Sequence, residues 1–188
     1  MDLVEGVATV ESVDVFVDRL GAIGDERGVT VQGFDARYVV DRRHLERAVD
    51  ARYVVDRRHL ERAVELADRA IDRGENVARD RAVEILCYAA GRRQIERALE
   101  MGVSAGEGPA VVLADERAGE GSAGRAAERE VAAAVRSMDA FDPAATLREY
   151  DPDLVEAFFD VGEAELAATD GDLPALVHER VALLDVEK

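Results

Sequence analysis

A predicted helical hairpin in the middle of the chain carries the side chains best suited to ion pairs or ligand binding, several arginines and one glutamate. Its two helices are expected to meet at Gly91. Arg92 and Arg93 follow that glycine directly, and Glu84 lies in the apolar stretch before it. Because a carboxylate is rarely buried without a partner, we expect Glu84 to pair with Arg93 or Arg92 across the turn. Alternatively, Arg93 and Gln94 present hydrogen-bond donors to a ligand. Arginine suits an anionic ligand because its planar guanidinium group can bind phosphate through two hydrogen bonds.

The other side chains of this hairpin allow two interpretations. Asn76 most simply caps the helix that follows it. The large apolar side chains are core residues by default. Aromatic residues, methionine and arginine are also enriched at interfaces, so one face could instead be a groove for a partner. The candidate partner-binding residues are Leu86, Tyr88, Ile95, Leu99 and Met101.

A glycine-rich segment, 119–124, matches the GxGxxG pattern of dinucleotide-binding turns and lies between a predicted strand and a predicted helix. Four residues separate that strand from Gly119, whereas the binding turn begins at the strand end. No second strand with a ribose-binding acid follows the helix. Four carboxylates would also face a pyrophosphate: Asp115, Glu116, Glu120 and Glu128. We therefore interpret residues 115–124 as a flexible loop, with a nucleotide-binding enzyme as the alternative.

The rest of the chain contains no constellation typical of catalysis. The histidines are His44, His59 and His178, and neither an HExxH nor a CxxC pattern occurs. Cys87 lies on the apolar face of its predicted helix, as an inert core thiol would. The sequence thus predicts no catalytic residue, no metal site and no cofactor. A structural module without a ligand remains a further alternative.

The charge of the chain is strongly acidic. Its 188 residues include 24 lysine and arginine residues against 41 aspartate and glutamate residues, for a formal net charge of −17. Lys188 is the single lysine. Such a composition is typical of proteins that work in near-saturated salt, where repulsion between like charges is screened. The charge therefore indicates a halophilic habitat. It excludes only a broad basic surface that follows the phosphate backbone of a nucleic acid.

Length and composition indicate one domain with a core of its own. A hydrophobic content of 48% excludes a disordered chain. No apolar run reaches the ~18 residues of a membrane span, and the acidic N-terminus shows no signal peptide. One cysteine excludes an internal disulfide and suits a reducing cytosol. We expect a cytoplasmic protein that does not bind membranes.

An exact repeat interrupts the N-terminal half. Residues 35–49 and 50–64 both read DARYVVDRRHLERAV. Structural repeats drift in sequence and need three or more copies to share a core, so we interpret the pair as a recent duplication or an error in the sequence. The fold needs one copy, and the other must bulge out or shift the end of a strand.

The elements that must position these residues are mostly helical. The alternation of apolar residues predicts an α/β (α+β) fold, with a small mixed sheet of three or four strands covered by several helices. Residues 141–143 are expected to form a break. The predicted strands are 7–10, 29–34 and 109–114, and the predicted helices are 13–23, 57–73, 81–90, 92–101, 125–138, 151–159, 163–168 and 175–184.

A set of short motifs extends over nearly the whole chain and is most specific in the central helices. They are Asp35-Ala36 or Asp50-Ala51, His44-Leu45 or His59-Leu60, the alanine-rich helix 63–70, Asn76-Val77-Ala78, 84–88, Gly91, Arg93-Gln94-Ile95, Ala98-Leu99, Gly102-Val103, the strand 111–113, 161–166 and 179–184. Together these motifs resemble the small non-catalytic subunit of the KEOPS complex, the TPRKB-like family that binds a PRPK-type kinase. The duplication departs from the family pattern between the strand and the helix.

The resemblance implies an archaeal adaptor without an active site of its own. Such subunits bind the kinase/ATPase subunit of KEOPS and support threonylcarbamoyladenosine modification of tRNA. Family members are also implicated in holding the single-stranded 3′ CCA end of the tRNA, which needs only a few arginines and stacking surfaces. The candidate tRNA-binding residues are Asn76, Arg79, Arg92, Arg93, Gln94 and Arg97.

Overall fold

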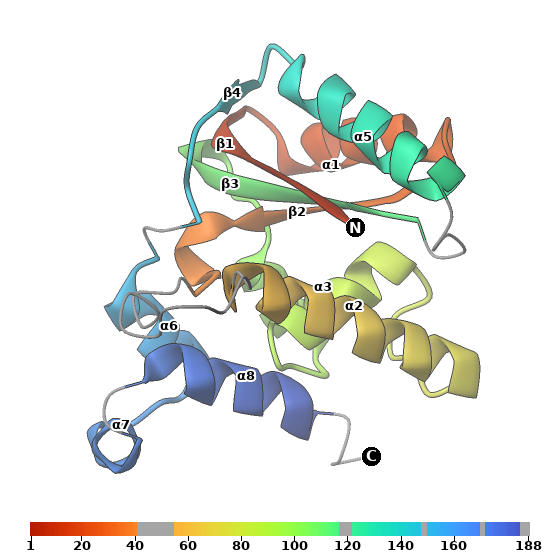
Figure 1. Ribbon diagram of the computed structural model, residues 1–188. Helices are drawn as coiled ribbons and strands as arrows, with labels where there is room; N and C mark the ends of the chain where they lie inside the picture. The colour runs from red at the N-terminus through yellow and green to blue at the C-terminus, as the bar shows by residue number, and fades with distance from the viewer. Residues whose placement is uncertain (41–54, 117–121, 148–149, 170–171, 185–188) are drawn as a thin grey trace.

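The computed structural model describes residues 1–40, 55–116, 122–147, 150–169 and 172–184 (Figure 1). Within them, four strands form a sheet in the order β2-β3-β1-β4. Their bounds are β1 Asp2–Val10, β2 Thr30–Asp35, β3 Gly106–Asp115 and β4 Phe141–Pro143. The three strand pairings are antiparallel, whereas we expected a mixed sheet. The helix-rich α+β class is confirmed.

Helices cover both faces of this sheet (Figure 1). Helices α1 (Val13–Asp25) and α5 (Ser122–Arg136) lie on one face. Helices α2 (Val55–Arg73), α3 (Arg81–Ala89) and α4 (Ile95–Ala98) lie on the other, with the short 3-10 helices η1 (Ala36–Tyr38) and η2 (Leu99–Met101). Helix α8 (Leu173–Leu183) lies beyond α2, on the side away from the sheet, with α7 (Glu163–Ala168) at its end. Helix α6 (Pro152–Phe159) lies to one side, where it packs against η1 and α8.

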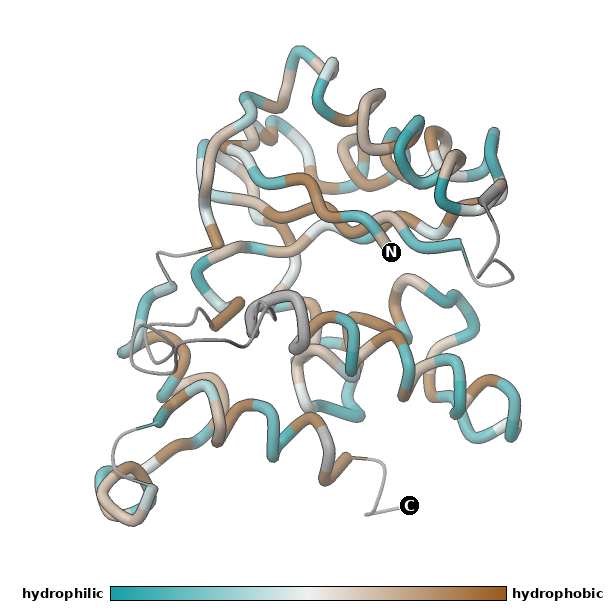
Figure 2. The backbone as a smooth tube through the Cα atoms, viewed as in Figure 1, coloured by the Kyte–Doolittle hydropathy of each residue, from teal (hydrophilic) through white to brown (hydrophobic). Residues whose placement is uncertain are grey.

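Strand β3 divides its side chains between two hydrophobic cores, because successive residues of a strand point to opposite faces. Val111 and Leu113 pack among α2, α3 and α8, whereas Val112 and Ala114 pack under α1 and α5. Figure 2 shows hydrophobic residues along the central strands of the sheet, which lie between the two layers of helices. The larger core lies on the α2–α3 side, where the candidate site residues are found.

Most element bounds follow the predicted periodicity, and the exceptions have local reasons. Residues 141–143 form β4 instead of a break, because an edge strand tolerates a proline that cannot donate a hydrogen bond. Helix α2 begins at Val55, two residues before the expected start at residue 57. The second hairpin helix, expected over 92–101, is reduced to α4 and η2.

The duplicated block contributes to three elements. Residues 35–40 of the first copy end β2 and form η1, whereas residues 55–64 of the second copy belong to α2. The segment between them, with His44, lies outside the described residues.

The expected loop at 115–124 is described only at its ends, where Asp115 closes β3 and residues 122–124 begin α5. Glycines 119 and 121 of the GxGxxG pattern lie outside the described residues. Among the residues described, no helix is long and apolar enough to cross a membrane.

Candidate docking surface at the α3–α4 turn

Gly91 makes the turn that joins α3 to α4. Its backbone is left-handed, with φ of 59°, a conformation that glycine adopts without a steric penalty. The N–H of Arg92 donates to the carbonyl of Cys87 at 3.0 Å, which satisfies a carbonyl at the end of α3. A Cβ on Gly91 would lie 3.5 Å from the Cβ of Arg180, so the turn packs closely against α8.

The side chain of Arg92 leaves this turn and covers the C-terminal end of α6. Its Nη2 donates to the carbonyl of Phe158 and, at 2.8 Å, to Oδ2 of Asp160. The guanidinium group also lies 5.5 Å from the centre of the Phe158 ring. The last carbonyls of a helix carry partial negative charge, so an arginine stabilises this end of α6.

Arg180 reaches the same end of α6 from α8. Its Nε donates to the carbonyl of Phe159 at 3.4 Å, and its Nη2 donates to both carboxylate oxygens of Glu165 at 2.7 and 2.9 Å. Sequence reasoning did not select Arg180, because 88 residues separate it from Arg92 and no local motif connects them.

A third arginine, Arg97, contributes positive charge to this place. The hydrogen bond from Arg92 lowers the pKa of the Asp160 carboxyl, and the charges of Arg92, Arg97 and Arg180 lower it further. We call Arg92, Arg97 and Arg180 the arginine cluster. Each of these arginines also pairs with a carboxylate: Arg92 with Asp160, Arg180 with Glu165, and Arg97 with Glu100 at 3.3 Å. An anionic ligand at this turn would therefore compete with these ion pairs.

The predicted nucleic-acid residues divide between the two ends of α3. Arg93, Gln94 and Arg97 are exposed at the α3–α4 turn beside Arg92, which is half-buried. Asn76 and Arg79 precede α3 and therefore lie at its other end, ~13 Å away for a nine-residue helix. One short ligand contact therefore cannot use all six side chains.

Asp80, not Asn76, caps α3. The Asp80 carboxylate accepts hydrogen bonds from the backbone N–H groups of Ala82 and Val83, at 2.8 and 3.2 Å. The Asn76 side chain instead donates to the carbonyl of Ala78 at 2.8 Å. The expected capping role of Asn76 is therefore wrong, since the cap must directly precede the helix and Asn76 lies four residues upstream of Asp80.

Glu84 is buried, with 1% of its surface exposed. Its Oε2 accepts hydrogen bonds from the N–H groups of Val77 and Ala78, at 2.9 and 2.7 Å. In the part of the chain that the structure describes, these backbone donors take the place of the ion pair that we expected with Arg93 or Arg92. That expectation is wrong because α3 directs Glu84 toward the segment before the helix, away from the turn after it.

Fewer apolar side chains are accessible to a partner than the sequence predicts. Leu86, Tyr88 and Met101 lie in the core with at most 2% of their surface exposed, so they support the surface from beneath. Ile95 is half-buried, and Leu99 is exposed at 53%. Of the five candidates, only Ile95 and Leu99 can meet a partner without rearrangement. Cys87 is buried, as expected of a core thiol.

Arg81, which also follows the Asn76 segment, is committed to an internal network. Its guanidinium group donates twice to the Asp68 carboxylate at 2.7 Å and once to the Asp115 carboxylate at 2.6 Å. Burial lowers the pKa of Arg81, but the hydrogen bonds to both carboxylates outweigh this effect and raise it overall. The network joins α2, α3 and β3, which fixes the N-terminal end of α3.

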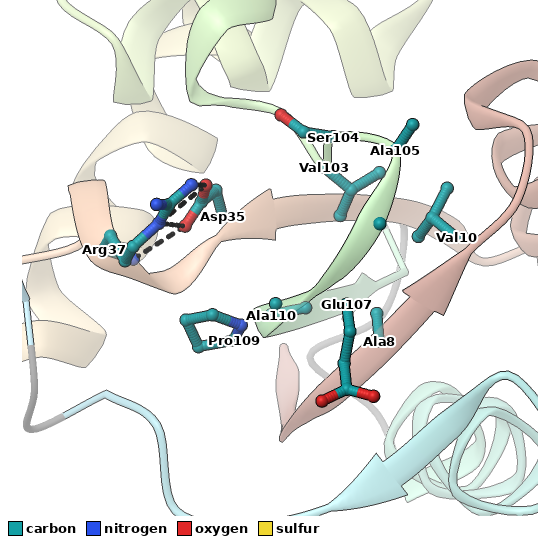
Figure 3. Close-up of a pocket in the computed structure, with 12 residues that line it drawn as sticks. Ala8, Val10, Asp35, Arg37, Val103, Ser104, Ala105, Glu107, Pro109 and Ala110 are labelled. Atoms are coloured by element: carbon teal, nitrogen blue, oxygen red, sulfur yellow. Dashed lines mark hydrogen bonds and ion pairs between the residues drawn. The ribbon is translucent and has the colours of Figure 1, made fainter.

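Two hollows on the surface differ in size and lining. One, of about 60 Å³, lies beside the end of β2, where Asp35 holds Arg37 through an ion pair of 2.6 Å (Figure 3). A volume of this size is far below the ~300 Å³ of typical small-molecule sites. The other, of about 360 Å³, lies at the start of α1 around Val15 and Phe16. No group of metal-ligating side chains is found among the described residues.

The fold and the site define an α+β domain that presents arginines and exposed apolar side chains at one helical turn. The sequence model of the family described as kinase binding protein CGI-121 matches residues 22–185, most of the chain. The chain therefore belongs to the CGI-121 family of kinase-binding proteins. None of the curated proteins matches it.

Proposed function

We propose that this protein is a non-catalytic adaptor that binds the kinase/ATPase subunit of KEOPS and the 3′ CCA end of tRNA. In this role it supports threonylcarbamoyladenosine modification of tRNA in the cytoplasm of a halophilic archaeon. The observation that carries the proposal is the match of residues 22–185 to a kinase-binding family. The engagement of Arg92 and Arg180 in structural contacts agrees with a surface that docks and does not catalyse.

The kinase-binding surface that we propose is centred on Ile95 and Leu99. Leu99 is one of the most exposed large apolar side chains of the described residues, and Ile95 lies on the same short helical segment. An apolar contact suits a protein of high net charge, because burial of apolar area does not weaken as salt screens charges.

The test is binding of the purified kinase subunit in molar KCl. Leu99→Glu is expected to weaken binding at least about tenfold, as for an apolar anchor at the centre of an interface. The matched control is Val15→Glu, which adds the same charge at a valine that is 68% exposed on α1, over the other face of the sheet. Unchanged binding by the Leu99 variant, or equal loss in the control, would place the interface elsewhere.

The proposed tRNA contact uses the exposed arginines of the α3–α4 turn. Arg97 of the arginine cluster and the neighbouring Arg93 are exposed and can reach a single-stranded tail, whereas Asn76 and Arg79 would contact a more distant part of the ligand. A short unpaired tail needs few phosphate contacts, so the overall negative charge does not oppose this role.

Intact tRNA and tRNA without its CCA end are compared for binding to the wild type and to two variants. Arg93→Glu is expected to weaken binding of intact tRNA, and the shortened tRNA is expected to bind poorly even to the wild type. Arg136→Glu, at an exposed arginine on α5, is the control of equal charge change. Equal affinity of the wild type for both tRNAs would refute recognition of the CCA end.

A further inference from the structure

A groove at the start of α1, which we call the α1 groove, lies over the face of the sheet opposite to α3 and α4. Its volume is about 360 Å³, within the ~300–1,000 Å³ of typical ligand sites. Val10, Phe16 and Met138 form its floor, since each is at most 5% exposed and belongs to the core under α1 and α5. Val15 lines the groove and is 68% exposed. A side chain that enters the groove therefore exchanges water for apolar neighbours.

Two carboxylates mark one end of the α1 groove. Glu11 follows β1, and Asp139 lies in the turn between α5 and β4. The N–H of Thr9 donates to the carbonyl of Ala140 at 2.9 Å, which joins the two segments and places both acidic residues at the same end. Both are exposed, and neither forms an ion pair or a hydrogen bond among the described residues. This end of the groove is therefore open to a cation.

Arg19 gives the other end of the α1 groove the opposite charge. It lies one helical turn beyond Val15, ~10 Å along α1 from the cap at Ser12. It is exposed and pairs with no carboxylate in the part of the chain that the structure describes. The groove thus has an acidic end, an apolar floor and a basic end. Molar salt screens charges beyond ~3 Å, so the floor supplies most of the affinity and the charged ends select the partner.

We propose that the α1 groove docks a segment of a partner protein whose side chains are basic, apolar and acidic in order along one face. The apolar side chain fills the groove, while a basic side chain meets Glu11 and Asp139 and a carboxylate meets Arg19. An extended segment points every second residue to one face, so three such residues span ~13 Å and reach both ends. Leu99 lies across the sheet from this groove, so the groove stays open when the α3–α4 turn is occupied.

The test adds a synthetic peptide with the core Arg-Ser-Leu-Ser-Glu, up to millimolar concentration, to the whole protein in molar KCl. Amide NMR signals report both the affinity and the place of binding. Saturable shifts are expected at Val15, Phe16 and Ala140. Two control peptides replace the leucine by alanine or the arginine by glutamate. Each is expected to bind at least about tenfold more weakly, because the first loses apolar burial and the second places like charges together.

Val15→Arg is expected to weaken binding of the same peptide at least about tenfold, because it replaces an apolar wall by a cation that repels the arginine of the peptide. Val17→Arg is the matched control, since Val17 is 47% exposed on the same helix but does not line the groove. It is expected to change binding less than about twofold. Leu99→Glu is expected to leave peptide binding unchanged, so the test is independent of the proposed kinase contact.

Three results would overturn the proposal. The first is the absence of saturable shifts, or equal binding of all three peptides. The second is an equal loss in Val15→Arg and Val17→Arg, which would show a general effect of added positive charge on α1. The third is self-association of the wild type, measured by sedimentation, that Val15→Arg abolishes, since a second copy of this chain would then be the occupant of the groove.

Discussion

Glu84 holds the segment before α3 in place through two buried hydrogen bonds to backbone donors. Glu84→Ala is expected to lower the free energy of unfolding by about 3 kcal/mol, because both donors stay buried without an acceptor. Glu84→Gln keeps one oxygen acceptor and is expected to lose less. Guanidinium denaturation of the two variants measures the difference. An alanine variant as stable as the glutamine variant would contradict the role of these hydrogen bonds.

Cys87 makes stability sensitive to alkaline pH. Burial, followed by the negative charge of Glu84, raises the pKa of its thiol to about 11. In the unfolded chain a thiol ionises near pH ~8.5, so between these values ionisation favours unfolding. The contribution of Cys87 to stability is therefore complete below pH ~8.5 and is lost as the pH rises toward the folded-state value. Unfolding free energies measured across this range are expected to fall more steeply in the wild type than in Cys87→Ala. Equal slopes would show that Cys87 does not cause the dependence.

At the scale of elements, β4 depends on a glycine in its neighbour. A Cβ added at Gly6 of β1 would lie 2.6 Å from the carbonyl oxygen of Asp142 in β4 and would also clash with the ring of Phe141. Because one of these atoms is backbone, Gly6→Ala must push the strands apart, and we expect a loss of about 1–3 kcal/mol in stability.

Gly108→Ala on β3 is the control for this substitution. A Cβ at Gly108 would meet no atom within 4 Å, so the alanine is expected to leave the melting temperature unchanged or slightly higher. Thermal unfolding followed by circular dichroism compares the two variants. Similar melting temperatures for both would mean that the contact between β1 and β4 is not close.

For the whole molecule, the net charge of −17 predicts stability that depends on salt. Repulsion among exposed carboxylates reaches ~10 Å at 0.1 M salt but only ~3 Å at 1 M. We therefore expect the melting temperature to rise with KCl and to level off in the molar range. Sucrose, which favours the compact state without screening charge, is the control. An equal rise in sucrose, or no rise in KCl, would contradict electrostatic repulsion as the cause.

Local patterns in the sequence were enough to locate most helices and three of the strands. The apolar spacing of α1, the Asp151-Pro152 start of α6 and the short α7 all act within a few residues, so their positions could be predicted. Strand β4 could not, because three residues ending in proline carry no alternation, and they become a strand only beside β1.

The sequence by itself determined the acidic surface, the α+β class and the arginines and leucine of the α3–α4 turn. Tertiary structure alone decided which of these side chains remain accessible: α3 is enclosed on several sides, so Leu86 and Tyr88 became core residues while Leu99 stayed exposed. It also brought Arg180 and Asp160 to Arg92 from distant parts of the chain. The physical reason is that periodicity specifies which side of an element is apolar, whereas the neighbour that covers it is chosen by the packing of the whole chain.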